Sequence, residues 1–223
     1  MTSVENQRQD GNLDALQRRV RLVALLDAAD KAGLTPLPIL RLHTLAYLSN
    51  VLAPVWKMPV LDGKVLKRQG GPFYPALQHD LDRLVGMGVG VISGLGHVLD
   101  EENRWRLEGS YQLNRVFADR IIHRLLGFEV ERRLMAFLQE LAFALSALSD
   151  MDLDRAMTED ATYSDSLIDF GNVVDFAEWQ KKNYSANAAQ YFNNSLPGGA
   201  RATPGEKLHL YVRHLQSRIR SGR

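Results

Sequence analysis

The stretch LKRQGGPFYPALQHDLDRLVGMGVG, from Leu66 to Gly90, decides the fold. In it, Pro72 and Pro75 enclose an aromatic pair. Proline fixes φ and is tolerated at the start of a helix but not deep inside one. The step is therefore expected to open a helix that ends at the glycines that follow. Its apolar positions recur at helical spacing and are Leu77, Leu81, Leu84 and Val85.

Two helices are expected before this stretch. The apolar stripe from Leu13 to Ala32 predicts the first. We expect Thr35 to cap the second helix and Pro36 to occupy its first position. The segment ILRLHTLAYLSNVLA that follows is apolar nearly all round, which predicts a buried helix. His43 within it is interpreted as a core histidine with a satisfied ring.

Two strands are expected after the stretch. Apolar residues alternate approximately from Val89 to Tyr111, and DEEN at Asp100–Asn103 supplies a turn. The glycines at 86–96 leave a helix and enter a strand, which is the reverse of a phosphate-binding loop. Three helices followed by a hairpin predict a winged helix-turn-helix.

The second half of the chain is expected to be helical. A long apolar pattern covers 115–148 and is divided or bent at Gly127. We expect a further helix over 175–194, and a last one opened by Thr203 and Pro204. The fold class is thus mainly α. The predicted domains are a winged helix-turn-helix at 1–112 and a helical interaction domain at 113–223.

Charge is distributed unevenly although the net charge is +1. Asp150–Glu178 holds nine acids and one base, whereas Arg201–Arg223 holds six bases and one acid. One interpretation is two solvated faces that partly neutralise each other. The other is an acidic and a basic surface for different partners. On the last helix the candidate partner-binding cations are Arg213, Arg218 and Arg220.

Catalytic chemistry is not indicated by any motif. The chain has no cysteine, and its six histidines show no metal-ligand spacing on one helical face. Asp80 and Asp82 diverge on a helix, so they do not form an acid/base pair. We expect no enzyme, metal site or cofactor. No apolar run approaches the ~20 residues of a membrane span, and we expect a cytoplasmic protein without membrane contact.

The Gly-Pro-aromatic-Pro step carries two interpretations. In the first, Phe73 and Tyr74 pack against the second helix and serve the fold. In the second, they are exposed anchors for a partner, together with Gln78 and His79 on the third helix.

DNA binding is the usual work of a winged helix, but the outer face of the third helix is nearly neutral. Affinity for duplex DNA depends on cations at the phosphates. We therefore expect weak contact without sequence preference. The cations that could make it are Lys64, Lys67, Arg68, Arg104 and Arg106.

RLHTLAYLSNVLA followed by GGPFYPALQHDLDRL resembles the Panacea domain of bacterial antitoxins. The resemblance covers Arg41 to Val85 and is carried by a Leu-Tyr-Leu-like element and a Gly-Pro-x-x-Pro step. The positions that match are Leu45, Tyr47, Leu48, Gly71, Pro72, Tyr74, Pro75, Leu77 and Leu81.

In overall layout the chain is also similar to the middle component of bacterial ABC-three-component defence systems, including Lamassu-type systems. That resemblance implies a non-enzymatic scaffold or regulatory subunit of an anti-phage or anti-plasmid complex, which bridges an SMC-like ATPase and an effector. One alternative is a Panacea-type antitoxin that neutralises a toxin. Another is a winged-helix transcription regulator.

Overall fold

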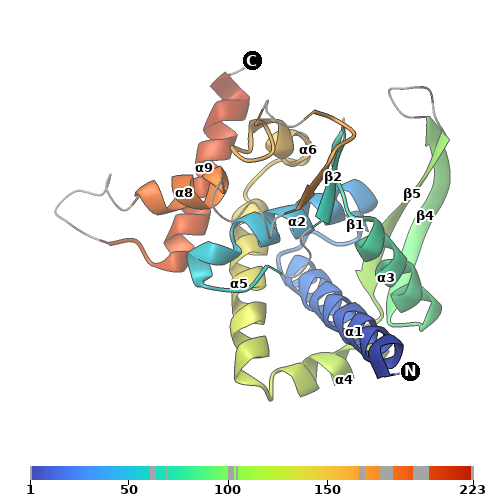
Figure 1. Cartoon of the computed structure of the whole chain (residues 1–223). Coiled ribbons are helices and arrows are strands. Elements are labelled where there is room, and N and C mark those ends of the chain that lie inside the picture. The colour runs from blue at the N-terminus through green and yellow to red at the C-terminus, as the bar shows by residue number, and fades with distance from the viewer. Residues whose placement is uncertain are drawn as a thin grey trace.

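The structure is a computed structural model, and it describes residues 2–60, 64–68, 70–99, 103, 105–165, 169–175, 183–192 and 201–221. The described chain is mostly helical, with two small antiparallel sheets (Figure 1). The helices are α1 (Thr2–Lys31), α2 (Ile39–Val51), the 3₁₀ helix η1 (Ala53–Trp56), α3 (Pro75–Gly86), α4 (Arg115–Leu125), α5 (Glu129–Leu145), α6 (Asp150–Glu159), α8 (Tyr184–Tyr191) and α9 (Pro204–Ser221). The strands are β1 (Leu37–Pro38), β2 (Lys64–Arg68), β3 (Gly71–Phe73), β4 (Gly90–Leu99), β5 (Trp105–Leu113) and β6 (Val173–Asp175).

Several predicted helix boundaries are confirmed by local chemistry. Pro75 is the first residue of α3, directly after extended Tyr74. A capping box opens α9, because Thr203 Oγ1 accepts from the Glu206 N–H while Glu206 Oε2 accepts from the Thr203 N–H. The break near Gly127 separates α4 from α5. Gly88 has φ +73° just after α3, so the predicted role of these glycines in ending that helix is confirmed.

The predicted start of the second helix is wrong. Thr35 does not cap α2, which begins at Ile39, and Thr35 Oγ1 instead donates to Asp30 Oδ1 at 2.6 Å. Leu37 and Pro38 form β1 and pair with Tyr111 and Ser110 of β5. A residue that precedes proline is biased towards extended backbone, which favours the strand at Leu37. The first helix also begins earlier than expected, at Thr2.

The two sheets have the strand orders β1-β5-β4 and β3-β2-β6. The predicted hairpin is β4–β5, paired from Gly90↔Leu113 to Leu99↔Trp105 with a bulge between Ser93 and Gly96. The second sheet was not predicted. It joins β2 to β6, which lies about a hundred residues further along the chain. Asp175 belongs to β6, so the helix expected from that residue is wrong at its first position, and most of its first half, 176–182, lies outside the described residues.

The hydrophobic core contains side chains from both halves of the chain. α1 packs against α5, and α5 packs against α9 (Figure 1). The largest side chains without solvent exposure include Tyr47, Tyr74, Tyr211 and Phe137. Buried residues on either side of position 112 belong to one cluster. The boundary between domains at 112 and 113 stays a prediction.

Candidate interaction site

The Gly-Pro-aromatic-Pro step is a strand followed by a helix start. Gly71 has φ +125° and begins β3, which pairs with β2 through Phe73↔Leu66. Tyr74 is the residue before α3 and has no solvent exposure. Its hydroxyl accepts from Asn50 Nδ2 of α2 at 3.2 Å. Tyr74 therefore holds α3 against α2, and its assignment as an exposed partner-binding residue is wrong.

His43 is the residue of α2 on which this step rests. It has no solvent exposure, and its Nδ1 accepts from the Tyr74 N–H at 3.2 Å. Its Nε2 lies 3.4 Å from Gln78 Oε1, so the neutral ring with a proton on Nε2 satisfies both contacts. Burial lowers the pKa of His43 to about 4. The interpretation of His43 as a core histidine is confirmed.

The other predicted partner-binding residues near this step differ in how far they are exposed. Phe73 is half-buried, with its ring 4.8 Å from that of His43. The Arg68 guanidinium lies over the ring of Phe73, 4.8 Å from the ring centre. Gln78 donates to Asp82 along α3 at 2.9 Å, and His79 is exposed. The structure therefore does not gather these four candidate side chains into one exposed surface.

The cations proposed for DNA contact do not form one strip either. Lys67 is 5% exposed, its Nζ donates to the Asp165 carbonyl, and burial lowers its pKa below the usual value, so its assignment to a DNA surface is wrong. Arg106 pairs with Glu108 at 2.5 Å. Arg68 covers Phe73, Lys64 is exposed, and Arg104 lies outside the described residues.

The basic last helix meets the acidic segment inside the molecule. Arg218 Nε lies 2.9 Å from Glu159 Oε2, and Arg220 Nη2 lies 3.9 Å from Asp152 Oδ2. Arg213 is exposed. The expected apolar stripe of α9 is buried at Leu208, Val212, Leu215 and Ile219. Of the two interpretations of the charge asymmetry, mutual neutralisation therefore describes Arg218 and Arg220.

Asp160, after α6, is a buried carboxylate that joins several helices. It has no solvent exposure and accepts from the hydroxyls of Tyr47 at 2.8 Å, Tyr211 at 2.6 Å and Ser185 at 2.8 Å. The backbone N–H groups of Thr162 and Tyr163 donate to its Oδ1. Burial and the nearby carboxylate raise the pKa values of Tyr47 and Tyr211. These phenols stay neutral donors, and the cluster ties α2 and α8 to α9.

Exposed apolar side chains gather on the β4–β5 hairpin. Alternate residues of a strand share one face, and on β5 this face is buried at Leu113 and Tyr111. It continues outward to Leu107, which is 56% exposed, and Trp105, which is 71% exposed. Figure 1 shows the Leu99–Trp105 end of the hairpin away from the helices.

The matching residues of β4 complete this surface. Leu99 pairs with Trp105 and is 46% exposed, and Leu95 is 57% exposed. A side chain at Gly109 would come within 2.7 Å of Ile92 and 3.4 Å of Leu95, so the missing side chain lets both lie across the strand. We call the four exposed residues Leu95, Leu99, Trp105 and Leu107 the hairpin strip.

The hairpin strip was not among the predicted site residues. The sequence does contain a signal for it. Large apolar residues alternate along β5, and the alternation continues beyond the buried part of the strand. Single exposed apolar residues are normal on a protein surface, whereas a contiguous group marks an interaction surface. The strip is thus the strongest candidate interaction site in the described chain.

No protein-family model matches the chain, and no curated protein sequence matches it. The resemblance at Arg41–Val85 therefore stays a prediction. None of the described helices is by itself long and apolar enough to cross a membrane, although α5 and α6, bent by 110°, reach that length and composition together. The described residues contain no group of three or more histidine or acidic side chains that could hold a metal ion.

Proposed function

We propose that this chain is a non-enzymatic assembly subunit of a cytoplasmic bacterial defence complex against phage or plasmids. Its part is to bridge an SMC-like ATPase and an effector. In this proposal α1, α2, α3 and the β4–β5 hairpin form a winged helix-turn-helix whose wing makes protein contacts. The resemblance to Panacea domains and to middle components supports it.

The hairpin strip is the observation that carries the proposal. Aromatic residues are enriched among the side chains that dominate binding energy at protein interfaces. Trp105 is 71% exposed and lies beside Leu99 and Leu107 on one face of a projecting hairpin. A partner that covers this face would remove apolar surface from water, which is the main favourable contribution in most protein association.

The regulator alternative has less support from the geometry. A winged helix that reads DNA needs free cations on the recognition helix or the wing. Asp82 on α3 accepts from Gln78, and Arg106 on the hairpin is paired with Glu108. Lys67 faces inward. Among the described residues, these contacts leave exposed Arg83 of α3 but little other cationic surface along α3 and the hairpin for phosphates.

The antitoxin alternative uses the same hairpin strip with a different partner. It differs from the main proposal in what is encoded beside the gene. A neighbouring SMC-like ATPase agrees with the defence subunit, and a single small toxin agrees with the antitoxin. The partner to be tested is therefore the neighbouring gene product, expressed together with this chain.

Co-purification of the SMC-like ATPase with the full chain tests the proposal. We expect Trp105→Ser with Leu107→Ser to lower the recovered ATPase at least about tenfold, because truncating a central apolar anchor costs 2 kcal/mol or more. Val116→Ser is the matched control, since Val116 is also 71% exposed but lies on α4. Equal recovery with the double variant and the control would reject the strip as the ATPase contact.

A further inference from the structure

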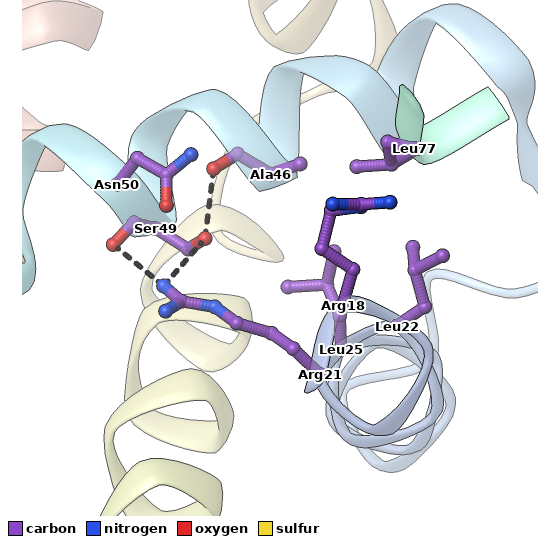
Figure 2. A pocket seen from close by; sticks show the side chains of 8 residues that line it. All are labelled: Arg18, Arg21, Leu22, Leu25, Ala46, Ser49, Asn50 and Leu77. Carbon is purple, nitrogen blue, oxygen red and sulfur yellow. Dashed lines mark hydrogen bonds between the residues drawn. The ribbon is translucent and has the colours of Figure 1, made fainter. Parts of the chain in front are cut away.

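A cleft lies between α1, α2 and α3 on the described chain (Figure 2). The empty space at the cleft measures about 350 Å³, and this figure includes open solvent. Arg18 and Arg21 of α1 reach into it towards different neighbours. Arg21 reaches Ser49 of α2, whereas Arg18 lies beside Leu77 of α3. Two cationic side chains thus line one small space.

Arg21 is a buried cation among neutral acceptors. It is 6% exposed. Its Nη1 donates to the Pro59 carbonyl, and its Nη2 donates to the carbonyl and hydroxyl of Ser49, at 3.2 to 3.3 Å. No carboxylate of the described residues lies within 4.0 Å of its nitrogens. Burial lowers the pKa of Arg21 to about 10. It therefore stays charged at neutral pH, and the carboxylate of Glu131 raises its pKa without lying in ion-pair contact.

Arg18 adds positive charge to the same cleft. Its Nε donates to Asp80 Oδ2 at 2.8 Å, and Arg19 Nε lies 3.8 Å from the other oxygen of that carboxylate. Asp80 is 1% exposed. Two guanidinium groups of α1 therefore face a single carboxylate of α3 at ion-pair distance, and Arg21 adds a third positive charge nearby. A guanidinium has five N–H donors, and the bond from Arg18 to Asp80 uses one of them.

Apart from Ser49 and Asn50 of α2, the remaining walls of the cleft are apolar. Leu22 and Leu25 come from α1, Ala46 from α2 and Leu77 from α3. Phosphate carries oxygen atoms on every side, so a bound phosphate would place charged oxygens against these apolar side chains. A carboxylate on a short aliphatic chain matches both parts, because guanidinium groups bind carboxylates through charge-assisted hydrogen bonds and the chain meets the leucines.

We propose that the cleft between α1, α2 and α3 binds a small aliphatic monocarboxylate, with its carboxylate at Arg21 and Arg18 and its chain against Leu22, Leu25 and Leu77. The site is independent of the hairpin strip and of any assembly function. The same chemistry is offered by a free short-chain acid and by the C-terminus of a peptide. We assign the free acid because the cleft is small and lies between three helices.

Thermal unfolding of the full chain with propionate tests the site, with propionamide as the neutral isostere and chloride matching the ionic strength. A ligand that binds only the folded state raises the Tm. At about ten times Kd we expect a saturable rise of roughly 3–6 °C with propionate and none with propionamide. N-acetylalanine represents a peptide C-terminus, and a larger rise with it would overturn the free acid as the source.

Variants separate binding from stability. Arg18→Gln keeps a long polar side chain and should reduce the rise. Ala46→Met fills the cleft without removing a cation and should abolish the rise. His79→Gln lies on the exposed face of α3 and is the matched control that keeps it. Equal shifts with propionamide, an equal shift with phosphate, or an unchanged shift in Ala46→Met would each overturn the proposal.

Discussion

Arg218 of α9 lies 2.9 Å from Glu159 of α6, and this pair joins the basic end of the chain to its acidic segment. Because of this contact, the two oppositely charged segments of the chain neutralise each other at this point. It also decides how mutations of the basic helix are to be interpreted.

Reversing Arg218 to Glu should lower the stability of the fold and not only alter a surface. Arg218 and Glu159 are 55% and 26% exposed, and exposed pairs contribute about 0.2–1 kcal/mol. The double variant Glu159→Arg with Arg218→Glu should restore the loss. Urea unfolding measures it. Arg213→Glu is the control, because Arg213 is exposed on the same helix; a larger loss there would contradict the assignment of the pair.

Removing the hydroxyl of Tyr74 should destabilise the packing of α3 on α2. Tyr74→Phe deletes the acceptor for Asn50 Nδ2 in a site without solvent exposure, and we expect a loss of about 1–3 kcal/mol. His79→Ala, at an exposed position of the same helix, should change stability by less than about 0.5 kcal/mol. Thermal and urea unfolding check both, and equal effects would show that the buried hydroxyl contributes nothing.

The stability of the protein should fall as the pH falls from about 6.5 to about 4. His43 has its pKa lowered from 6.5 to about 4 in the folded state. Between these values the unfolded chain binds a proton that the folded chain does not, so acid favours unfolding. The full contribution of His43 is roughly 3 kcal/mol. It is present above pH 6.5 and is lost progressively on acidification towards pH 4.

Urea unfolding of His43→Gln at several pH values isolates this contribution. The variant should be less stable at pH 7.5, because it disturbs the contacts of Tyr74 and Gln78, but its stability should fall less steeply on acidification. His97→Gln is the control, since His97 is exposed on β4. Parallel pH dependences for wild type and His43→Gln would show that His43 is not the group that titrates.

Replacing Asp160 by Ala should be among the most destabilising changes in the chain. The substitution removes the common acceptor of three buried hydroxyls and two backbone N–H groups. We expect a loss of about 3 kcal/mol or more, because buried donors left unsatisfied carry their full desolvation cost. Asp165→Ala, at a partly buried position a few residues on, is the comparison. Similar melting temperatures for both variants would show that the cluster is dispensable.

Duplex DNA should bind the isolated chain weakly and without sequence preference. With Lys67 of β2 buried and Arg106 of the hairpin paired, few free cations remain near α3 and the hairpin in the described part of the chain, and phosphate contacts dominate affinity. Gel-shift titrations at physiological salt should give no specific Kd tighter than about 10⁻⁸ M, a typical specific affinity. A tighter, sequence-dependent complex would instead favour the regulator.

The helices were predictable because their determinants are local. The stripe of Leu208, Val212, Leu215 and Ile219 and the cap at Thr203 are both readable within one segment, and the structure confirms both. The three-helix order followed by a hairpin was likewise carried by proline, glycine and apolar spacing within single segments.

The second sheet was not predictable from such local patterns. β2 pairs with β6 from the far half of the chain, so no neighbouring sequence indicates it. Once β2 is extended, its period of two places Lys67 on the same buried face as Val65. A lysine that was predicted to contact DNA is therefore directed inward. Without the pairing of β2 with β6, the sequence KVLKR indicates only a basic segment.

Because the chain is synthesised from its N-terminus, the residues of the Asp160 cluster are made at different times. Tyr47 precedes Asp160 by 113 residues, and Tyr211 follows it by 51. When the carboxylate leaves the ribosome, the second phenol has not yet been made, so the site must stay hydrated until α9 emerges. Only then can the water leave and the core close. A ribosome stalled before residue 211 would hold a chain whose central acid lacks its Tyr211 donor and is still in solvent.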